Sequence, residues 1–250
     1  SLASRRQMGS VAVRVGHTAK LASRDEEALE AFSRAIAINR QILTERPNDV
    51  SAQRTLVSAH TNRGDTLRSP FTRRGIRSDL SLAEYQQARE IAGRLLAADP
   101  TSFTAQLDVV MADLQIADTW RELEPRKGVQ ELARALAELE RVAARNPAYK
   151  DTARLRAQVS LAVADAQARA GERGAAERTY GEAIGFFAKV LAADPARFQM
   201  RRDLVMAYAE RGWLELQRGD RASAAHDAEA CLPLSRAMET KKARPMDLRD

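Results

Sequence analysis

Three pairs of oppositely charged residues are the part of this sequence best suited to binding chemistry. The pairs are Asp65/Arg68, Asp118/Arg121 and Asp165/Arg169. Residues three or four positions apart lie on one face of an α-helix, so each aspartate can bond its arginine. As surface ion pairs they would contribute only about 0–1 kcal/mol each. As a ladder of donors and acceptors they can instead hydrogen-bond an extended peptide, and the sequence leaves both interpretations open.

Histidine, cysteine and serine form no catalytic or metal-binding pattern. His17, His60 and His226 have no cysteine or histidine at ligand spacing, and Cys231 is the single cysteine. One cysteine excludes an internal disulfide framework and a cysteine-based zinc site. His60 takes the repeat position of Tyr208 and is predicted to pack in the core. We expect no catalytic residue, metal or cofactor in this chain, and an enzyme built on helical repeats is the least favoured alternative.

The composition points to helices with solvated charged faces. Hydrophobic residues make up 44% of the chain but aromatic residues only 5%, and the abundant alanine favours closely packed helices. The net charge is +6, with both signs interspersed through most of the chain. The segment 63–77 is the exception, because it holds five arginines and one aspartate, and it leaves nucleic-acid binding as an alternative function. No run of about 18 apolar residues occurs, so we expect no membrane insertion of this chain.

Repeated prolines show how the chain is organised. "LAADP" occurs at 96–100 and again at 191–195, and the weaker forms "TERPN" and "ARNPA" surround two further prolines. The four prolines are 53, 47 and 48 residues apart: Pro47, Pro100, Pro147 and Pro195. A fixed period in this range indicates a repeat architecture. Because proline lacks an N–H and disfavours α geometry at the preceding residue, each one is predicted to end a helix.

Other positions repeat in register with these prolines. Fifteen residues before each proline lies a phenylalanine, tyrosine or leucine: Phe32, Tyr85, Leu132 and Tyr180. Seventeen residues after each proline lies a small residue, and Gly16 continues that series toward the N-terminus: Gly64, Ala117, Ala164 and Gly212. Apolar residues at helical spacing lie between these positions. Each period is therefore predicted to be a helical hairpin that buries its apolar face by stacking on its neighbours.

The last repeat resembles a tetratricopeptide repeat. Tyr208, Gly212, Gly219, Asp220 and Ala224 stand at the relative positions of the aromatic, Gly, Gly-Asp and Ala landmarks of that repeat. The resemblance implies an all-α, right-handed α-solenoid of stacked antiparallel helical hairpins. The period of about 48 residues exceeds the usual value of about 34, so we predict helices of roughly 20 residues, or about 30 Å each.

We predict one repeat domain over residues 1–240, with about four and a half hairpins, and a flexible tail at 241–250. Pro233 lies ten residues before the next expected proline position, so it is predicted to interrupt the final helix. The chain lacks an initiator Met and begins inside a repeat, and we interpret it as part of a longer protein.

The resemblance also implies where a ligand binds. In tetratricopeptide arrays, residues one and about four or five positions past the small landmark line a concave groove. Here that set is His17, Lys20, Asp65, Arg68, Asp118, Arg121, Asp165, Arg169, Trp213 and Gln217. We expect this groove to bind a protein or an extended peptide, with Trp213 as an apolar anchor. No repeat carries the Lys/Asn pair with which chaperone-tail-binding relatives hold a terminal carboxylate, so that ligand class is not expected.

A narrower resemblance suggests a context for this binding. The stretches "RRDLVMAYAERGWLELQRGD" and "GDTLRSPF" resemble the long-period repeats in the C-terminal extension of large bacterial Ser/Thr protein kinases. We therefore expect a non-catalytic binding scaffold or sensor module from a larger bacterial signalling protein. Its compartment would be cytoplasmic by default, and extracytoplasmic where a kinase domain and a membrane helix precede the repeats. The oligomeric state is left open.

Overall fold

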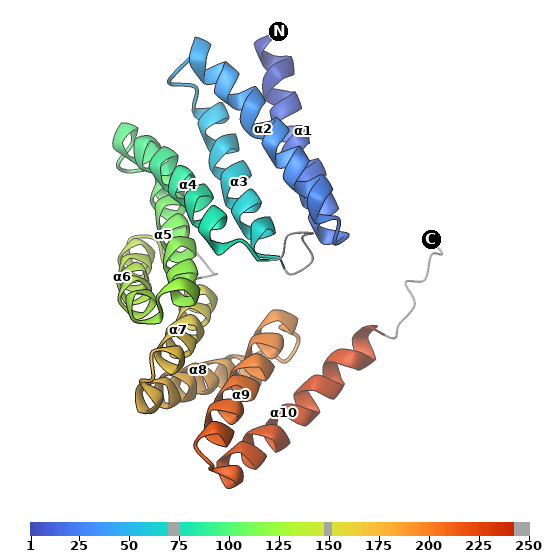
Figure 1. The fold of residues 1–250 in the computed structure, drawn as a ribbon, viewed down its shortest axis with the longest axis vertical. Helices are drawn as coiled ribbons and strands as arrows, with labels where there is room; N and C mark the ends of the chain where they lie inside the picture. The colour runs from blue at the N-terminus through green and yellow to red at the C-terminus, as the bar shows by residue number, and fades with distance from the viewer. Residues whose placement is uncertain (70–75, 148–151, 243–250) are drawn as a thin grey trace. The chain divides into compact units, whose positions relative to one another are not determined.

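The computed structural model describes residues 1–69, 76–147 and 152–242, and every regular element within them is an α-helix. In chain order the helices are α1 (Leu2–Leu21), α2 (Asp25–Glu45), α3 (Val50–Leu67), α4 (Ser78–Ala98), α5 (Phe103–Leu123), α6 (Pro125–Ala144), α7 (Thr152–Arg169), α8 (Arg173–Ala193), α9 (Phe198–Gln217) and α10 (Arg221–Lys242). They follow one another as consecutive pairs (Figure 1). The predicted all-α fold class is confirmed. The first helix, α1, has 20 residues and is about as long as the helices that follow it.

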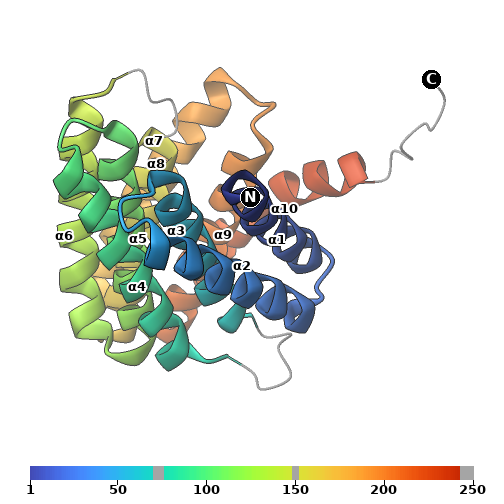
Figure 2. The ribbon, with the colours of Figure 1, turned by 90° about the horizontal axis from the view of Figure 1, so that it is seen from above.

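The chain divides into two compact units, each described here by itself. Unit 1 comprises Ser1–Leu123 and Ala137–Pro147, and unit 2 comprises Glu124–Leu136 and Ala148–Asp250. In unit 1, α1 to α5 each pack against the next helix, and α1 also contacts α3 (Figures 1 and 2). In unit 2, α7 to α10 pack in the same way, with α7 against α9. The first helices of neighbouring pairs thus lie side by side within each unit, as stacked hairpins require.

Prolines and turn residues set the helix ends. Helices α2, α4 and α8 each end two residues before a proline, as predicted: Pro47, Pro100 and Pro195. Asp49 then caps α3, because its side chain accepts a hydrogen bond from the N–H of Ala52. Gly171 and Gly219 adopt φ values of +83° and +81° in the turns before α8 and α10. Only glycine adopts this conformation without strain, so these two residues allow the tight reversals between helices.

Glycines bring the helices of each pair close together in unit 1. A Cβ on Gly16 would lie 2.5 Å from a ring carbon of Phe32, and a Cβ on Gly64 would lie 2.6 Å from a ring carbon of Tyr85. Both rings are completely buried. A side chain at either glycine would therefore push the helices apart. The small and large landmarks of the sequence repeat are, in these two pairs, the two sides of one contact.

Unit 2 packs the corresponding positions less tightly. Ala164 shares a buried cluster with Tyr180 and Leu214. Gly212 faces α10, but a Cβ there would lie 3.5 Å from its nearest neighbour, the Cβ of Asp227, which is an ordinary van der Waals separation. Glycine at position 212 is therefore compatible with the packing but is not required by it.

Pro233 does not interrupt α10, contrary to the sequence prediction. The helix continues through Pro233 to Lys242. Proline removes one backbone hydrogen bond and crowds the preceding turn. The adjacent Leu234, however, packs against the buried cluster that contains Phe187 and Leu204. Burial against neighbouring helices outweighs the local penalty, and residues 243–250 of the predicted tail lie outside the described residues. The single repeat domain over residues 1–240 stays a prediction.

Candidate functional site

In unit 1, charged residues of the predicted groove form ion pairs between the first helices of neighbouring pairs. The Nζ of Lys20 on α1 lies 3.1 Å from Oδ2 of Asp65 on α3. The hydroxyl of Tyr85 on α4 donates to the other oxygen of Asp65 at 2.8 Å. Burial raises the pKa of Tyr85 and the negative charge of Asp65 raises it further, so the phenol stays protonated and can donate. Both oxygens of Asp65 are therefore engaged within the fold.

Arg68 continues this pattern from α3 to α5. Its guanidinium lies 2.7 Å from Oδ2 of Asp118 and also bonds Glu122. Arg121 donates to the second oxygen of Asp118 at 2.8 Å. Burial alone would lower the pKa of Arg68, but the charges and hydrogen bonds of Asp118 and Glu122 outweigh it and raise that pKa. The positive charge of Arg68 is therefore permanent, and its side chain is only 15% exposed.

These contacts change the pairing inferred from the sequence. Asp118 and Arg121 pair within α5, three residues apart, as predicted. Asp65 and Arg68 instead bond neighbouring helices. Charged groups that are half-buried and hydrogen-bonded contribute more than solvated surface pairs. We call Lys20, Asp65, Arg68, Asp118 and Arg121 the charge ladder, and its contacts join α1, α3 and α5.

The histidines of unit 1 have structural surroundings. His17 is exposed, and its ring meets Phe32 edge to face with centroids 5.9 Å apart. His60 is buried, and its Nδ1 lies 2.7 Å from Glu84, which also bonds Arg63. His60 is thus a core residue, as predicted, with a hydrogen-bonding role in addition.

Several arginines of the basic segment 63–77 are already paired with carboxylates. Arg63 bonds Glu84, Arg68 bonds Asp118, and Arg77 lies 3.6 Å from Asp79. Residues 70–75 of the segment lie outside the described residues. The three paired arginines present less free positive charge for a nucleic-acid backbone than the sequence suggests.

In unit 2, the predicted pair of α7 is an exposed ion pair. Arg169 donates to Asp165 at 2.8 Å across one helical turn, as predicted, and its side chain is 52% exposed. Gln217 is exposed at the end of α9. The Asp165–Arg169 pair joins two residues of the same helix, whereas contacts of the charge ladder run between helices.

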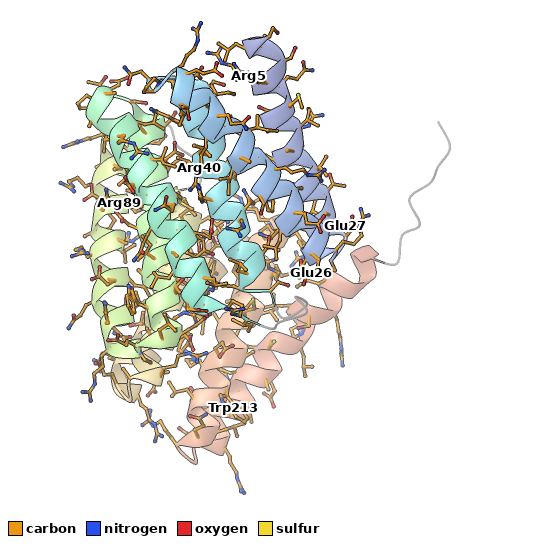
Figure 3. All side chains as sticks on the ribbon, turned by 45° about the horizontal axis from the view of Figure 1, so that its top comes forward. Arg5, Glu26, Glu27, Arg40, Arg89 and Trp213 are labelled. Carbon is orange, nitrogen blue, oxygen red and sulfur yellow. The ribbon has the colours of Figure 1, made fainter. Side chains whose placement is uncertain are left out.

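One face of α9 carries exposed apolar side chains. Met206 is 52% exposed, Trp213 60% and Leu216 49%, and the exposed Ala209 lies between them. Intervals of three or four residues place all four on one side of the helix. Figure 3 labels Trp213 and, on other helices, the charged side chains of Arg5, Arg40 and Arg89. We call Met206, Ala209, Trp213 and Leu216 the α9 stripe.

Of the α9 stripe, Trp213 was predicted from the sequence as a site residue, and Met206, Ala209 and Leu216 were not. The signal was present in the spacing of Met206, Ala209 and Leu216 around the tryptophan. Apolar residues at this spacing more often form the buried face of a helix than an exposed binding surface. The exposure of these side chains in the structure distinguishes the two cases.

Two acidic residues share one arginine between α9 and α10. Arg211 donates to both carboxylate oxygens of Asp227, at 2.7 and 2.5 Å. Oε1 of Glu215 lies 3.7 Å from the same guanidinium, and its Oε2 is buried without a hydrogen-bond partner. Burial raises the pKa of Glu215, the charge of Asp227 adds to this, and Arg211 opposes it. The carboxylate of Glu215 is therefore the least well accommodated charge of the group.

Across residues 1–69, 76–147 and 152–242, no group of three or more His, Cys, Asp or Glu side chains could hold a metal ion. In that part of the chain, none of the helices combines the length and the apolar character needed to span a membrane. The half-buried Cys231 lies 3.8 Å from the carbonyl oxygen of Val205.

Comparison with known proteins identifies the fold. No model of a known protein family matches the sequence, and no curated protein matches it. The Rap conjugation gene regulator of plasmid pLS20, solved in complex with the Phr* peptide, aligns with a TM-score of 0.61 and 12% identity over 91% of this chain and 53% of its own. BtubC (BKLC) from P. vanneervenii aligns with a TM-score of 0.60 and 15% identity over 100% and 94%. The apo form of RapI gives 0.51 and 12% over 94% and 85%.

At these identities the similarity concerns the fold alone. It agrees with the repeat found in the sequence, and the chain has the all-α fold of helical repeats that the sequence predicted.

Proposed function

We propose that this chain is a non-catalytic module that binds a protein or peptide segment, and that the α9 stripe is its main recognition surface. The observation that carries the proposal is the exposure of Met206, Trp213 and Leu216 on one side of one helix. Large apolar side chains that gather on a surface are typical of interaction sites. The ordered helix beneath them presents the side chains in a fixed arrangement, which reduces the ordering cost of binding.

The chemistry of the α9 stripe favours a partner with apolar side chains. Tryptophan is enriched among the residues that dominate interface energies. Complete burial of a side chain such as Met206 or Leu216 contributes about 1.5–3 kcal/mol. Gln217, exposed next to Leu216, can donate to and accept from a peptide backbone. The structural neighbour solved with the Phr* peptide supports the idea that this fold accommodates a peptide.

Seven of the ten residues predicted to line a groove have a role in this proposal. Trp213 and Gln217 contact the partner directly. The charge ladder holds α1, α3 and α5 at fixed spacing, because its hydrogen bonds run between those helices. Rigid spacing keeps the exposed faces of these three helices of unit 1 preformed.

We further propose that the module acts within a larger bacterial signalling protein such as a Ser/Thr kinase. This rests on the sequence resemblance of "RRDLVMAYAERGWLELQRGD" and "GDTLRSPF". The nucleotide sequence upstream of the codon for Ser1 tests it. An open reading frame that continues into a kinase domain supports the proposal, and an upstream stop codon contradicts it.

Selection of peptides from a random displayed library tests the binding function. We expect the wild-type chain to enrich peptides with two or more apolar residues. The double variant Met206→Ser/Trp213→Ser should bind the selected peptides at least about tenfold more weakly, because two apolar contacts are lost. In a Trp120→Phe background, Trp213 is the remaining tryptophan, and its fluorescence should shift to shorter wavelength when the peptide buries it.

Leu232→Ser is the matched control, because Leu232 is 53% exposed on α10 and its loss removes a similar apolar group outside the α9 stripe. It should bind like the wild type. Equal binding by the double variant would place the site elsewhere. A selection that enriches no peptide would reject peptide binding by this chain.

A further inference from the structure

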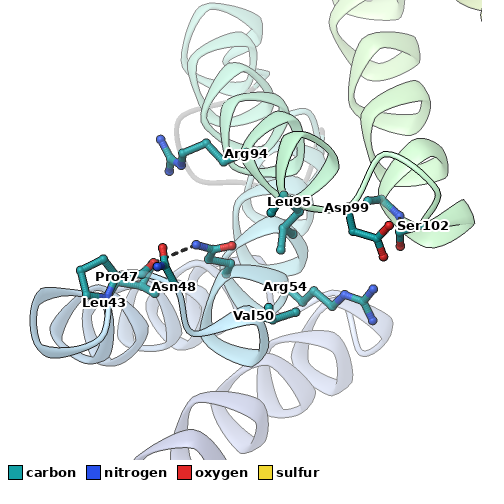
Figure 4. Close-up of a pocket in the computed structure, with 12 residues that line it drawn as sticks. Leu43, Pro47, Asn48, Val50, Arg54, Arg94, Leu95, Asp99 and Ser102 are labelled. Carbon is teal, nitrogen blue, oxygen red and sulfur yellow. Dashed lines mark hydrogen bonds between the residues drawn. The ribbon is translucent and has the colours of Figure 1, made fainter.

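A second candidate binding site lies at one end of the helices in unit 1, between the α2–α3 turn and the α4–α5 turn. The pocket has a volume of about 600 Å³. Its walls are mainly apolar and include Leu43, Val50, Leu95 and Ala105 (Figure 4). A hydrogen bond from the Gln53 side chain to the carbonyl of Pro47 holds one rim in place. The pocket therefore has a defined shape formed by two ordered turns.

Comparison of the repeats explains why this end of the molecule is hollow. Val50 is the first residue of α3 and lies three residues after Pro47. The same position holds Phe103 at the start of α5 and Phe198 at the start of α9. Both phenylalanines are half-buried, whereas Val50 is 52% exposed. The smaller valine leaves space at a position where other repeats of the same chain place an aromatic ring.

The polar residues at the pocket offer donors to an anion. Arg54 lines the pocket and is exposed. Its charge opposes the burial that raises the pKa of the Asp108 carboxyl, but within the described residues it forms no hydrogen bond or ion pair. Arg94 lies on the opposite wall and is bonded to Glu90. Oδ1 of Asp99 accepts from both the N–H and the hydroxyl of Thr101, and a carboxylate offers no donor to an anion. Arg54 is thus the group at this pocket with unused charge-assisted hydrogen bonds.

We propose that this pocket binds an aromatic side chain of a partner peptide, with a carboxylate of a neighbouring peptide residue bonded to Arg54. The ring occupies the space beside Val50, Leu95 and Ala105, as Phe103 and Phe198 do at their own positions in the repeat. This site is separate from the α9 stripe, because all of its residues belong to unit 1 and the stripe belongs to unit 2.

Methyl NMR of the full chain with three short peptides tests the site. The probes are acetyl-Glu-Phe-Glu-amide, acetyl-Glu-Ala-Glu-amide and acetyl-Gln-Phe-Gln-amide. We expect saturable shifts of the Val50, Leu95 and Ala105 methyl groups with the first peptide. The alanine peptide should bind at least about tenfold more weakly, since it lacks the ring. The glutamine peptide should also bind more weakly, and added salt should reduce its difference from the glutamate peptide.

Two variants locate the site and separate loss of binding from loss of folding. Val50→Phe fills the pocket from within and should abolish the shifts while the circular dichroism spectrum is unchanged. Leu21→Phe is the matched control, because Leu21 is 87% exposed and does not line the pocket. Arg54→Gln should bind the glutamate and glutamine peptides equally well.

Three results would overturn the proposal. The first is wild-type binding by a folded Val50→Phe variant. The second is equal binding of the alanine and phenylalanine peptides. The third is binding of free phenylacetate as tight as that of the glutamate peptide, because the occupant would then be a small aromatic acid. A Met206→Ser/Trp213→Ser variant should bind the glutamate peptide normally, so failure at one site is distinguishable from failure at the other.

Discussion

The same repeat position is used in opposite ways in the charge ladder of unit 1 and in the last helix pair of unit 2. One residue past the small landmark, unit 1 has Asp65 and Asp118, whereas unit 2 has Asp165 on α7 and Trp213 on α9. The aspartates of unit 1 are bonded to residues of neighbouring helices, whereas the tryptophan is 60% exposed. A repeat position therefore fixes where a side chain lies on its helix but not what the side chain does. A residue with a partner on the next helix stabilises the stack, and an apolar residue without such a partner is available to bind another molecule.

The largest expected contrast concerns two aromatic residues. Tyr85 is completely buried, touches the backbone region of Gly64 and donates to Asp65. Tyr85→Ala should lower the free energy of unfolding by about 3–5 kcal/mol, because it leaves a cavity and an unpaired carboxylate oxygen. Trp213→Ala should change it by no more than about 0.5 kcal/mol, because the ring is exposed.

Urea unfolding followed by circular dichroism measures both variants. Tyr85→Phe separates the two causes, since it keeps the ring and removes only a hydrogen bond to a charged group, worth about 1.5–3 kcal/mol. A destabilisation by Trp213→Ala as large as that by Tyr85→Ala would contradict the distinction between the two regions.

The next contrast compares two arginines. Arg68 is 15% exposed and bonds Asp118 and Glu122, whereas Arg169 is 52% exposed and bonds Asp165 within its own helix. Arg68→Gln should destabilise the chain by about 1.5–3 kcal/mol, the range for hydrogen bonds to charged groups. Arg169→Gln should cost less than about 1 kcal/mol. Thermal unfolding at low and high salt measures the difference, and equal values for both variants would remove the charge ladder as a stabilising feature.

Two glycines test how tightly each unit packs its helix pairs. Gly64→Ala places a Cβ 2.6 Å from the Tyr85 ring and should destabilise the chain by about 1–2 kcal/mol. Gly212→Ala places a Cβ at 3.5 Å from its nearest neighbour and should be neutral or stabilising by up to about 1 kcal/mol, through the better helix propensity of alanine. Melting temperatures of the two variants should therefore move apart. A decrease of equal size for both would show that unit 2 packs as tightly as unit 1.

Much of the fold was predictable because prolines and small and aromatic residues recur at fixed positions in each repeat. The prolines at 47, 100 and 195 each end a helix as predicted, and the two sides of the Gly64–Tyr85 contact stand at fixed offsets from Pro47 and Pro100. Pro233 broke this rule, because the burial of Leu234 against other helices is a tertiary effect that no local signal reports.

The candidate sites were less predictable for the same physical reason. The sequence pairs Asp65 with Arg68 by spacing, but Arg68 reaches Asp118 and Glu122 about fifty residues away. Exposure separates the α9 stripe from a core face, and exposure depends on whether another helix covers it. The pocket beside Val50 could have been suspected from Phe103 and Phe198 at the same position, yet its walls come from two turns that only folding brings together.

The smallest predicted effect is a pH-dependent change in stability caused by a buried carboxylate in unit 2, at a position where unit 1 has an apolar residue. Glu215 lies three residues past Gly212, where unit 1 has the buried Leu67 three residues past Gly64. The pKa of Glu215 is raised from its ordinary value of 4.5, mainly by burial. The folded chain therefore binds the Glu215 proton more tightly than the unfolded chain, so this group lowers stability as the pH rises above about 4.5 through the raised pKa.

Glu215→Gln should thus raise the melting temperature slightly at neutral pH while Arg211 keeps its bonds to Asp227. The advantage should disappear below about pH 4, where the wild-type carboxyl is protonated in both the folded and the unfolded state. Glu210→Gln is the control for the change in net charge, since Glu210 is exposed on the same helix. Melting curves from pH 4 to pH 8 measure the effect. A difference between Glu215→Gln and the wild type that stays constant across this range would show that packing, and not the buried charge, distinguishes this position from Leu67.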